Sequence, residues 1–326
     1  MVPVLKSLCA GLAVVSVLAA SPAFAQASAA SGKPITFVVP FTAGSGTDVV
    51  ARVLGDHLSK ALGQAIVVDN KAGAGGTLGA AQVASSAPDG LTVLIHSAGH
   101  VANAALYPKL KYDTLKDFTP VAMLATLPNV LVVSPASGIR SVEELVRKAQ
   151  AQPGKMTYAS AGNGSATHIN AEKFRIAARI QASHVPYRGT PPALMDVVGG
   201  QVDWTFAPLV SALSLIQENK LVPLAVGSQA RSAALPKAPT TLEAGYAGSD
   251  YTFWVGMFVP AKTPAETVKR LASATAQVLQ QPEVKAALAK VGAEVPTLTQ
   301  QQFADSVAQE MATTTTLIRQ AGIKVD

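Results

Sequence analysis

One pattern occurs twice in this chain of 326 residues: a short β-rich strand, then a loop of small residues, then a helix. Alternating strands and helices are typical of α/β proteins with largely parallel sheets, because each helix packs on the sheet that its strand has joined. The repetition therefore predicts two such units in one chain. The expected elements are strands Ile35–Val39 and Met156–Ala159, a first loop Pro40–Asp48 and a second loop Ser160–His168, and helices Val49–Leu62 and Ile169–Ala178.

The connection between the two units is indicated by another repeated pattern, a strand followed by a capping box. In a capping box, a Ser or Thr hydroxyl and a Glu or Gln three residues later bond to free N–H groups at a helix start. We interpret both places as crossings between two lobes. The strands are Val130–Val133 and Gly256–Val259, and the boxes are Ser141 with Glu144 and Thr263 with Glu266.

These crossings divide the chain into lobes. The first lobe is expected to contain residues 33–126 and 228–326, and the second lobe residues 127–227. Further expected elements are strands Ile66–Val68, Leu91–Ile95 and Asn129–Val133, a glycine-rich turn Gly73–Gly79, and helices Pro264–Gln280, Pro282–Lys290 and Gln300–Gln320, the last with a capping box of Thr299 and Gln302.

The N-terminal 25 residues predict a secretory signal peptide. Lys6 is followed by the apolar run Leu8–Ala20, the helix breaker Pro22 and an A-x-A sequence that ends at Ala25. The alternative is a membrane anchor, but about 18 apolar residues barely span a bilayer. Pro22 and the A-x-A sequence favour cleavage after Ala25 and export to the periplasm.

Composition excludes several classes of function for the exported product. The only cysteine, Cys9, is lost with the signal, which leaves no thiol chemistry and no thiolate metal site. Loss of Lys6 lowers the formal net charge of +6 by one. The remaining basic residues are spread along the chain without a Lys/Arg run, so we expect no nucleic-acid partner. No later apolar stretch reaches 18 residues, and we expect a soluble monomer without a cofactor.

The two loops are the best candidates for a binding site. Small residues let a ligand approach the backbone, and the unpaired N–H groups and positive dipole end of a helix start favour an anion. The alternative is a pair of ordinary Gly/Ser caps. The candidate ligand-binding residues are Phe41, Ala43, Gly44, Ser45, Thr47, Asp48, Ser97, Ser160, Gly162, Ser165, Thr167, His168, Arg188 and Asp203.

Three of these candidates have individual roles. Phe41 is expected either to cover a ligand or to pack in the core, and Arg188 either to pair with a carboxylate through two parallel hydrogen bonds or to be an ordinary surface arginine. For Asp203 the interpretations stay open: a contact between the lobes, a partner for an amino group, or the cap of a turn.

Other chemistries fit the sequence poorly. In the dinucleotide-binding fingerprint, Val49 would occupy the third glycine position, and no Walker A motif is present. Ser165 lies in no G-x-S-x-G elbow, and His168 three residues later does not have triad geometry, so we expect no enzymatic activity. His96 and His100 are four residues apart, but the segment between them is a poor helix without a carboxylate, so we expect no metal site.

The chain strongly resembles the Bug/TctC family, the extracytoplasmic solute receptors of tripartite tricarboxylate transporters. The resemblance runs over most of the chain after the signal. The motifs that carry it are Pro40-Phe41-x-Ala43-Gly44 with Asp48, Gly63-Gln64 before Val67–Lys71, Gly73–Gly76, Pro88–Gly90, Tyr112-Asp113 with Asp117-Phe118, His184–Gly189, Gly199–Asp203, and Leu235-Pro236 with Pro239-Thr240.

The resemblance implies a type II periplasmic-binding-protein fold, in which two lobes close on a carboxylated solute held by the two loops. It also implies delivery to the membrane subunits of a tripartite tricarboxylate-type transporter. Known family ligands are di- and tricarboxylates, acidic amino acids and aromatic acids. An alternative role is a sensor that reports the same ligands to a membrane signalling protein. The family usually has Gly where this chain has Ser45, so specificity does not carry over, and His96 and His100 lie in a variable segment that tunes the pocket.

Overall fold

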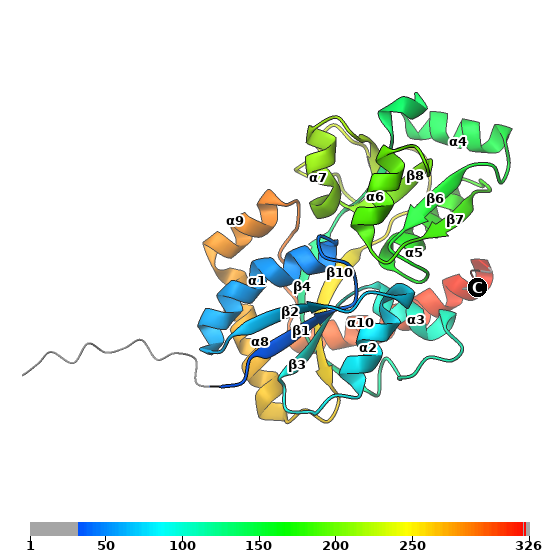
Figure 1. Ribbon diagram of the computed structural model, residues 1–326. Coiled ribbons are helices and arrows are strands. Elements are labelled where there is room, and N and C mark those ends of the chain that lie inside the picture. Colours follow the sequence, from blue (N-terminus) through cyan, green and yellow to red (C-terminus); the bar gives the residue numbers. More distant parts are fainter. Residues whose placement is uncertain (1–31, 322, 324–326) are drawn as a thin grey trace, which may run out of the picture.

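The computed structural model describes residues 32–321 and 323, and these form two lobes, each built on a five-stranded sheet (Figure 1). The predicted signal peptide lies outside the described residues. The first lobe has strand order β2-β1-β3-β10-β4 and the second β7-β6-β8-β5-β9. The first sheet contains β1 (Ile35–Val39), β2 (Ile66–Asn70), β3 (Thr92–Ser97), β4 (Phe118–Leu127) and β10 (Phe253–Pro260). The second contains β5 (Asn129–Val133), β6 (Thr157–Ser160), β7 (Ser183–Pro186), β8 (Trp204–Pro208) and β9 (Val222–Val226).

Helices flank both sheets, as the sequence predicts for an α/β protein. The first lobe has α1 (Gly46–Leu62), the 3₁₀ turn η1 (Ala74–Gly76), α2 (Thr77–Ala84), α3 (Gly99–Leu106), α8 (Ala265–Gln280), α9 (Pro282–Lys290) and α10 (Gln300–Ala321). The second has η2 (Pro135–Ser137), α4 (Val142–Ala151), α5 (Ala166–Ala177), α6 (Thr190–Val198) and α7 (Leu209–Gln217). Among the described helices, none is both long and apolar enough to cross a membrane.

Both sheets are mixed. The antiparallel strand of the second sheet is β5, by which the chain enters the second lobe, and that of the first sheet is β10, by which the chain returns to the first lobe. β5 pairs antiparallel with β8 and β9, and β10 pairs antiparallel with β3 and β4, whereas β1, β2 and β3 run parallel, as do β6, β7 and β8. The carboxyl ends of the parallel strands β1 and β6 lead into the two loops. The fold thus places a loop from each lobe on facing edges of the two sheets.

The two crossings between the lobes lie just before the strands that the sequence predicts for them. The chain crosses at Pro128, and Val130–Val133 is already an inner strand of the second sheet. Residues 228–251 pack on the second lobe: Val226 forms a bridge with Thr240, and the Ser249 carbonyl accepts a hydrogen bond from Asn170. The chain therefore returns to the first lobe at β10, later than the boundary expected at residue 228.

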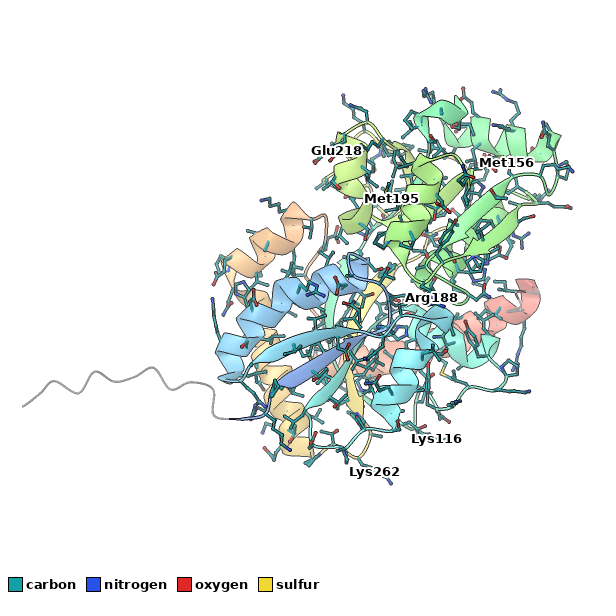
Figure 2. The ribbon with its side chains drawn as sticks, in the orientation of Figure 1. Lys116, Met156, Arg188, Met195, Glu218 and Lys262 are labelled. Carbon is teal, nitrogen blue, oxygen red and sulfur yellow. The ribbon has the colours of Figure 1, made fainter. Side chains whose placement is uncertain are left out.

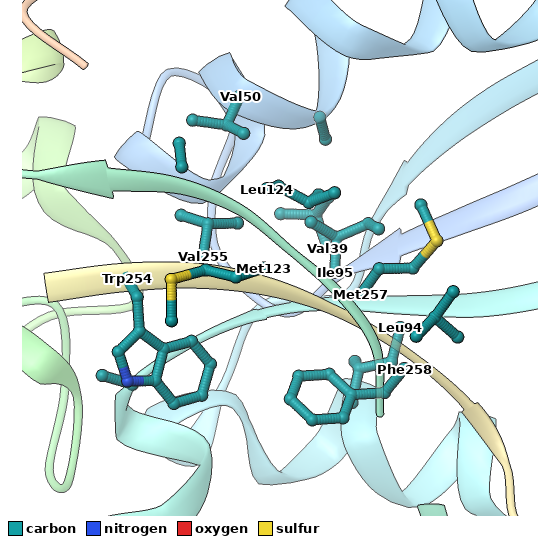
Figure 3. Packing of buried hydrophobic residues seen from close by; sticks show 14 of the residues in the cluster. Val39, Val50, Leu94, Ile95, Met123, Leu124, Trp254, Val255, Met257 and Phe258 are labelled. Atoms are coloured by element: carbon teal, nitrogen blue, oxygen red, sulfur yellow. The ribbon is translucent and has the colours of Figure 1, made fainter. Parts of the chain in front are cut away.

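The core of the first lobe surrounds β10, whose residues are all buried. Val39, Ile95 and Val255, from three neighbouring strands, pack together with Leu124 (Figure 3). A central strand covered on both faces is expected to be apolar at every position rather than at alternate ones. This rigid sheet is the support on which the first loop is held.

Several local predictions need correction. α1 begins at Gly46 and α5 at Ala166, three residues earlier than expected, so the ends of both loops are first helical turns. The expected turn Gly73–Gly79 ends in helix α2. The capping box at Thr263 is wrong, because α8 begins after Pro264 without a side-chain cap.

The other two capping boxes bring their hydroxyls to the expected amides. Ser141 accepts a hydrogen bond from Glu144 N at 3.2 Å, and Thr299 accepts one from Gln302 N at 3.3 Å. The Gln302 side chain also accepts from Thr299 N, which completes the reciprocal pair.

Candidate functional site

The two loops have the same backbone frame at the point where each meets its helix. Gly44 and Gly164 have left-handed φ angles of 80° and 76°. The next residue in each loop is the N-cap serine: Ser45 with φ −66° and ψ 153°, and Ser165 with φ −63° and ψ 158°. Left-handed backbone favours glycine because a Cβ is strained there. The structure therefore has two helix starts with nearly the same backbone angles, one on each lobe.

In both loops the side chain of the third helical residue accepts a hydrogen bond from the glycine N–H, but the accepting group differs. Gly44 N donates to a carboxylate oxygen of Asp48 at 2.9 Å, and Gly164 N donates to Nδ1 of His168 at 3.1 Å. One loop is therefore tied by a carboxylate and the other by an imidazole. Neither side chain lines the pocket described next.

The two helix starts face each other across a buried pocket between the lobes, and its cavity volume of about 10 Å³ leaves room for about one water molecule. Within the described part of the chain, no residue lining this pocket carries a charge. Hydroxyl groups line both lobes' sides, and two phenylalanine rings complete the wall. The lining residues are Phe41, Ser45, Gly46, Thr47, Ser97, Ala161, Ser165, Ala166, Thr167, Thr190 and Phe253.

Six of the sequence candidates meet in this pocket: Phe41, Ser45, Thr47, Ser97, Ser165 and Thr167. Their positions follow from the loops and from the carboxyl end of β3. Gly46 and Ala166, the first residues of the two helices, and Ala161 in the second loop also line it, although the sequence analysis did not single them out. Thr190 and Phe253 were missed because only the tertiary fold brings α6 and β10 to the two loops.

Asp48 supports the first loop and lies outside the pocket. Its carboxylate accepts hydrogen bonds from Gly44 N, from Nε of Arg52 at 3.0 and 3.1 Å, and from Asn70 Nδ2 at 2.9 Å. Burial alone would raise the pKa of Asp48, but the hydrogen bonds from Arg52, Gly44 and Asn70 outweigh it and the pKa lies below its ordinary value. The carboxylate is charged and its acceptors are occupied, which corrects its assignment to the ligand.

His168 and Ser160 also support a loop from outside the pocket lining. The His168 ring stacks on His184 with ring centroids 4.0 Å apart, and His184 Nε2 lies 2.6 Å from Ser160 Oγ. Burial lowers the pKa of His168 to about 4, so the ring is neutral at neutral pH. Ser165 Oγ accepts from the backbone N–H of His168 at 3.3 Å, so this contact is a helix cap rather than a nucleophile–base pair.

The remaining candidates lie away from the pocket lining. Arg188 is exposed at the junction of the lobes (Figure 2), and Ala43 and Gly44 are exposed in the first loop. Gly162 supports close packing of the lobes: a Cβ there would lie 3.3 Å from Gly75 N. Asp203 accepts hydrogen bonds from the Thr157 amide and hydroxyl at the far end of β6, so it fixes a strand start rather than a ligand.

His96 and His100 lie behind the pocket, in the core of the first lobe. His96 contacts Phe41 edge-on with centroids 5.4 Å apart, and His100 packs among Tyr112 and two phenylalanines. Burial lowers the pKa of His96 to about 4 and the pKa of His100 well below its ordinary value. Within residues 32–321 and 323, no group of three or more His, Cys, Asp or Glu is placed to hold a metal ion.

Comparison with known proteins identifies this architecture. The profile of the tripartite tricarboxylate transporter family receptor, TctC, matches residues 50–323. BugT of Bordetella pertussis is 33% identical over 319 residues, which cover 96% of this chain and 98% of BugT. The structure of MatC from Rhodopseudomonas palustris with bound malate has a TM-score of 0.84 and 35% identity over 87% of this chain and 98% of MatC.

A second structure from R. palustris, Rpa4515 with adipate, has a TM-score of 0.86 and 34% identity, over 89% of this chain and 98% of that one. The two-lobed fold with mixed sheets is thus the type II periplasmic-binding-protein fold that the sequence predicts. The chain belongs to the Bug/TctC family of tripartite tricarboxylate transporter receptors.

Proposed function

We propose that this protein is an exported receptor that encloses a small carboxylated organic anion between its lobes. One observation carries the proposal: the helix starts of α1 and α5, from opposite lobes, meet at one uncharged, hydroxyl-lined pocket. Free N–H groups and the positive end of a helix dipole stabilise an anion without a cationic side chain. Two relatives of similar fold were solved with malate and with adipate, which are both dicarboxylates.

The charges near the two helix starts suggest how such a ligand lies. Asp48 places a negative charge in the first turn of α1, partly offset by the half-exposed Arg52. His168 occupies the same place in α5 and is neutral. The ligand's carboxylate therefore belongs at α5, and its other polar end at Thr47 of α1. Phe41 and Phe253 are positioned to pack on the carbon skeleton.

The other parts of the proposal concern location and partners. We propose that the signal is cleaved after Ala25, that the protein acts in the periplasm as a monomer, and that it delivers its ligand to membrane subunits of a tripartite tricarboxylate-type transporter. Membership of the family supports delivery. The receptor is expected to release its ligand chemically unchanged.

Titration calorimetry with a panel of di- and tricarboxylates, acidic amino acids and aromatic acids tests the binding function. At least one acid should bind, and its neutral amide should bind at least about tenfold more weakly, since a charged group gains about 1.5–3 kcal/mol from its hydrogen bonds. Because the pocket lining is uncharged, the affinity should change little with salt. Binding of sugars or metal ions alone, without any acid, would contradict the proposal.

A further inference from the structure

Ser45 makes a contact that its counterpart Ser165 does not make. Both are N-cap residues with nearly the same backbone angles. The Ser165 hydroxyl caps its own helix, at His168 N. The Ser45 hydroxyl makes no capping bond to α1 and instead accepts a hydrogen bond from Thr190 N at 3.2 Å, across the cleft in the other lobe.

Thr190 N is the N–H group at the start of α6 that most needs a hydrogen-bond acceptor. Thr190 is the first residue of α6, and Pro191 and Pro192 follow it. Proline has no N–H, so Thr190 supplies the only unpaired N–H among the first three positions of this helix. The N-cap residue, Gly189, has no side chain with which to accept it. The first lobe thus supplies the cap that the second lobe lacks.

The surrounding packing fits this contact closely. A Cβ at Gly189 would lie 2.0 Å from Thr42 Oγ1 and 2.7 Å from Ser45 Oγ, both in the first lobe. Two further hydrogen bonds flank it between the lobes: Thr42 N donates to the Arg188 carbonyl at 3.3 Å, and Ser211 Oγ donates to the Gly44 carbonyl at 3.0 Å. Ser45 is itself buried.

We propose that Ser45 is a positioning residue that caps α6 across the cleft and favours the closed arrangement of the lobes before any ligand binds. In the open arrangement its hydroxyl turns back to the amides of α1. Closure therefore frees those amides for the ligand; this last step rests on the proposed anion-binding function. The capping contact itself stands whatever the ligand is.

The test is made without ligand, so that it is independent of the proposed function. Spin labels are attached at Lys116→Cys and Met195→Cys, two exposed positions on opposite lobes (Figure 2), in the protein without residues 1–25 and hence without Cys9. Pulsed electron paramagnetic resonance then gives the populations of closed and open lobes. Amide exchange by NMR reports on the Thr190 N–H in the same protein.

Ser45→Ala should lower the closed-to-open ratio by about 3- to 10-fold, as expected for one lost hydrogen bond, and speed the exchange of the Thr190 amide. Gly189→Ala should remove most of the closed population. Its φ of 168° suits alanine, so the only obstacle is the other lobe. The control is Ser141→Ala, which removes a similar cap within α4, far from the cleft.

An unchanged lobe distance in both Ser45→Ala and Gly189→Ala would overturn the proposal, even if the Thr190 amide exchanges faster. An equal shift in Ser141→Ala would do the same, because the effect would then come from loss of stability rather than from the contact between lobes.

Discussion

The first loop (Pro40–Asp48) and the second loop (Ser160–His168) share one frame but are held by different groups. The carboxylate of Asp48 lies among Arg52, Asn70 and Gly44 N, whereas His168 is a neutral imidazole stacked on a second histidine. Both arrangements place a helix start at the same pocket. The shared backbone conformation of the two loops therefore sets the position of the site, and the side chain at the third helical position, Asp48 or His168, sets the local charge.

The largest effect should come from forcing the chemistry of the first loop onto the second. His168→Asp should destabilise the protein by about 3–5 kcal/mol at neutral pH, the usual cost of an unpaired buried charge. No counterpart of Arg52 is free there, since Arg175 already pairs with Glu172 at 2.7 Å. Urea unfolding measures the loss. The same change at His57, a partly buried residue on α1, is the control and should have little effect.

The buried His168 should also make the protein less stable as the pH falls. The pKa of His168 is about 4, below the ordinary value of 6.5, so between these values the unfolded chain binds a proton that the folded protein does not. Stability therefore falls as the pH decreases through this window. From about pH 6.5 to about pH 5, this one group should cost up to about 2 kcal/mol.

Several groups contribute to this pH dependence, and each either lowers or raises the stability as the pH falls. The low pKa values of His96, His100 and His184 act in the same direction as that of His168. Glu310 opposes them, because burial raises its pKa to about 7 and the folded protein then binds the extra proton. Unfolding free energies at several pH values should show a shallower slope in His168→Gln. An unchanged slope would show that folding does not lower the pKa of His168.

A smaller effect is expected when the charge is removed from the first loop. Asp48→Asn keeps an oxygen for Gly44 N but loses the ion pair with Arg52, which is half exposed and hence partly screened. We expect a loss of about 1–2 kcal/mol at neutral pH. The depressed pKa of Asp48 means that this stability is present above pH 3.8 and disappears as the pH falls through the folded value. A variant as stable as the wild type at pH 7 would show that the carboxylate is dispensable.

The smallest effects are expected from two hydroxyl residues of the pocket, and they separate a role in ligand binding from a role in the stability of the fold. Thr47→Ala should weaken acid binding by about 1–2 kcal/mol with little loss of stability, because its hydroxyl lines the pocket and caps no helix. Ser165→Ala should weaken binding by a similar amount and also destabilise the fold by about 1 kcal/mol, because it removes a helix cap. Calorimetry and urea unfolding measure the two quantities, with the exposed Thr316→Ala as control. Unchanged affinity in both variants would move the site elsewhere.

Local sequence predicted much of the architecture, because the relevant signals are short-range. Strands Ile35–Val39 and Asn129–Val133 and helix Pro282–Lys290 have the predicted bounds. Helix α2 was hidden because the turn before it is rich in glycine, and Gly73, Gly75 and Gly76 adopt positive φ angles that no periodicity reveals.

The site was predicted less completely, for a physical reason. The two loops could be aligned by their small residues, and this alignment pairs Thr47 with Thr167, which line the same pocket in the structure. Nothing local to Asp203 or Asp48 shows that each carboxylate is already satisfied by the protein. The arrival of Phe253 in the pocket depends on the return of the chain from the second lobe. Such contacts are set by tertiary packing rather than by spacing.

In the proposed function, both loops hold one anion. A crystal structure with the tightest-binding acid tests it most directly. We predict a carboxylate within about 3 Å of the first-turn N–H groups of α5, with Thr47 Oγ1 at the ligand's other end. A ligand seated elsewhere, for example in the groove between α2 and Lys109, or touching only one of the two loops, would contradict the claim.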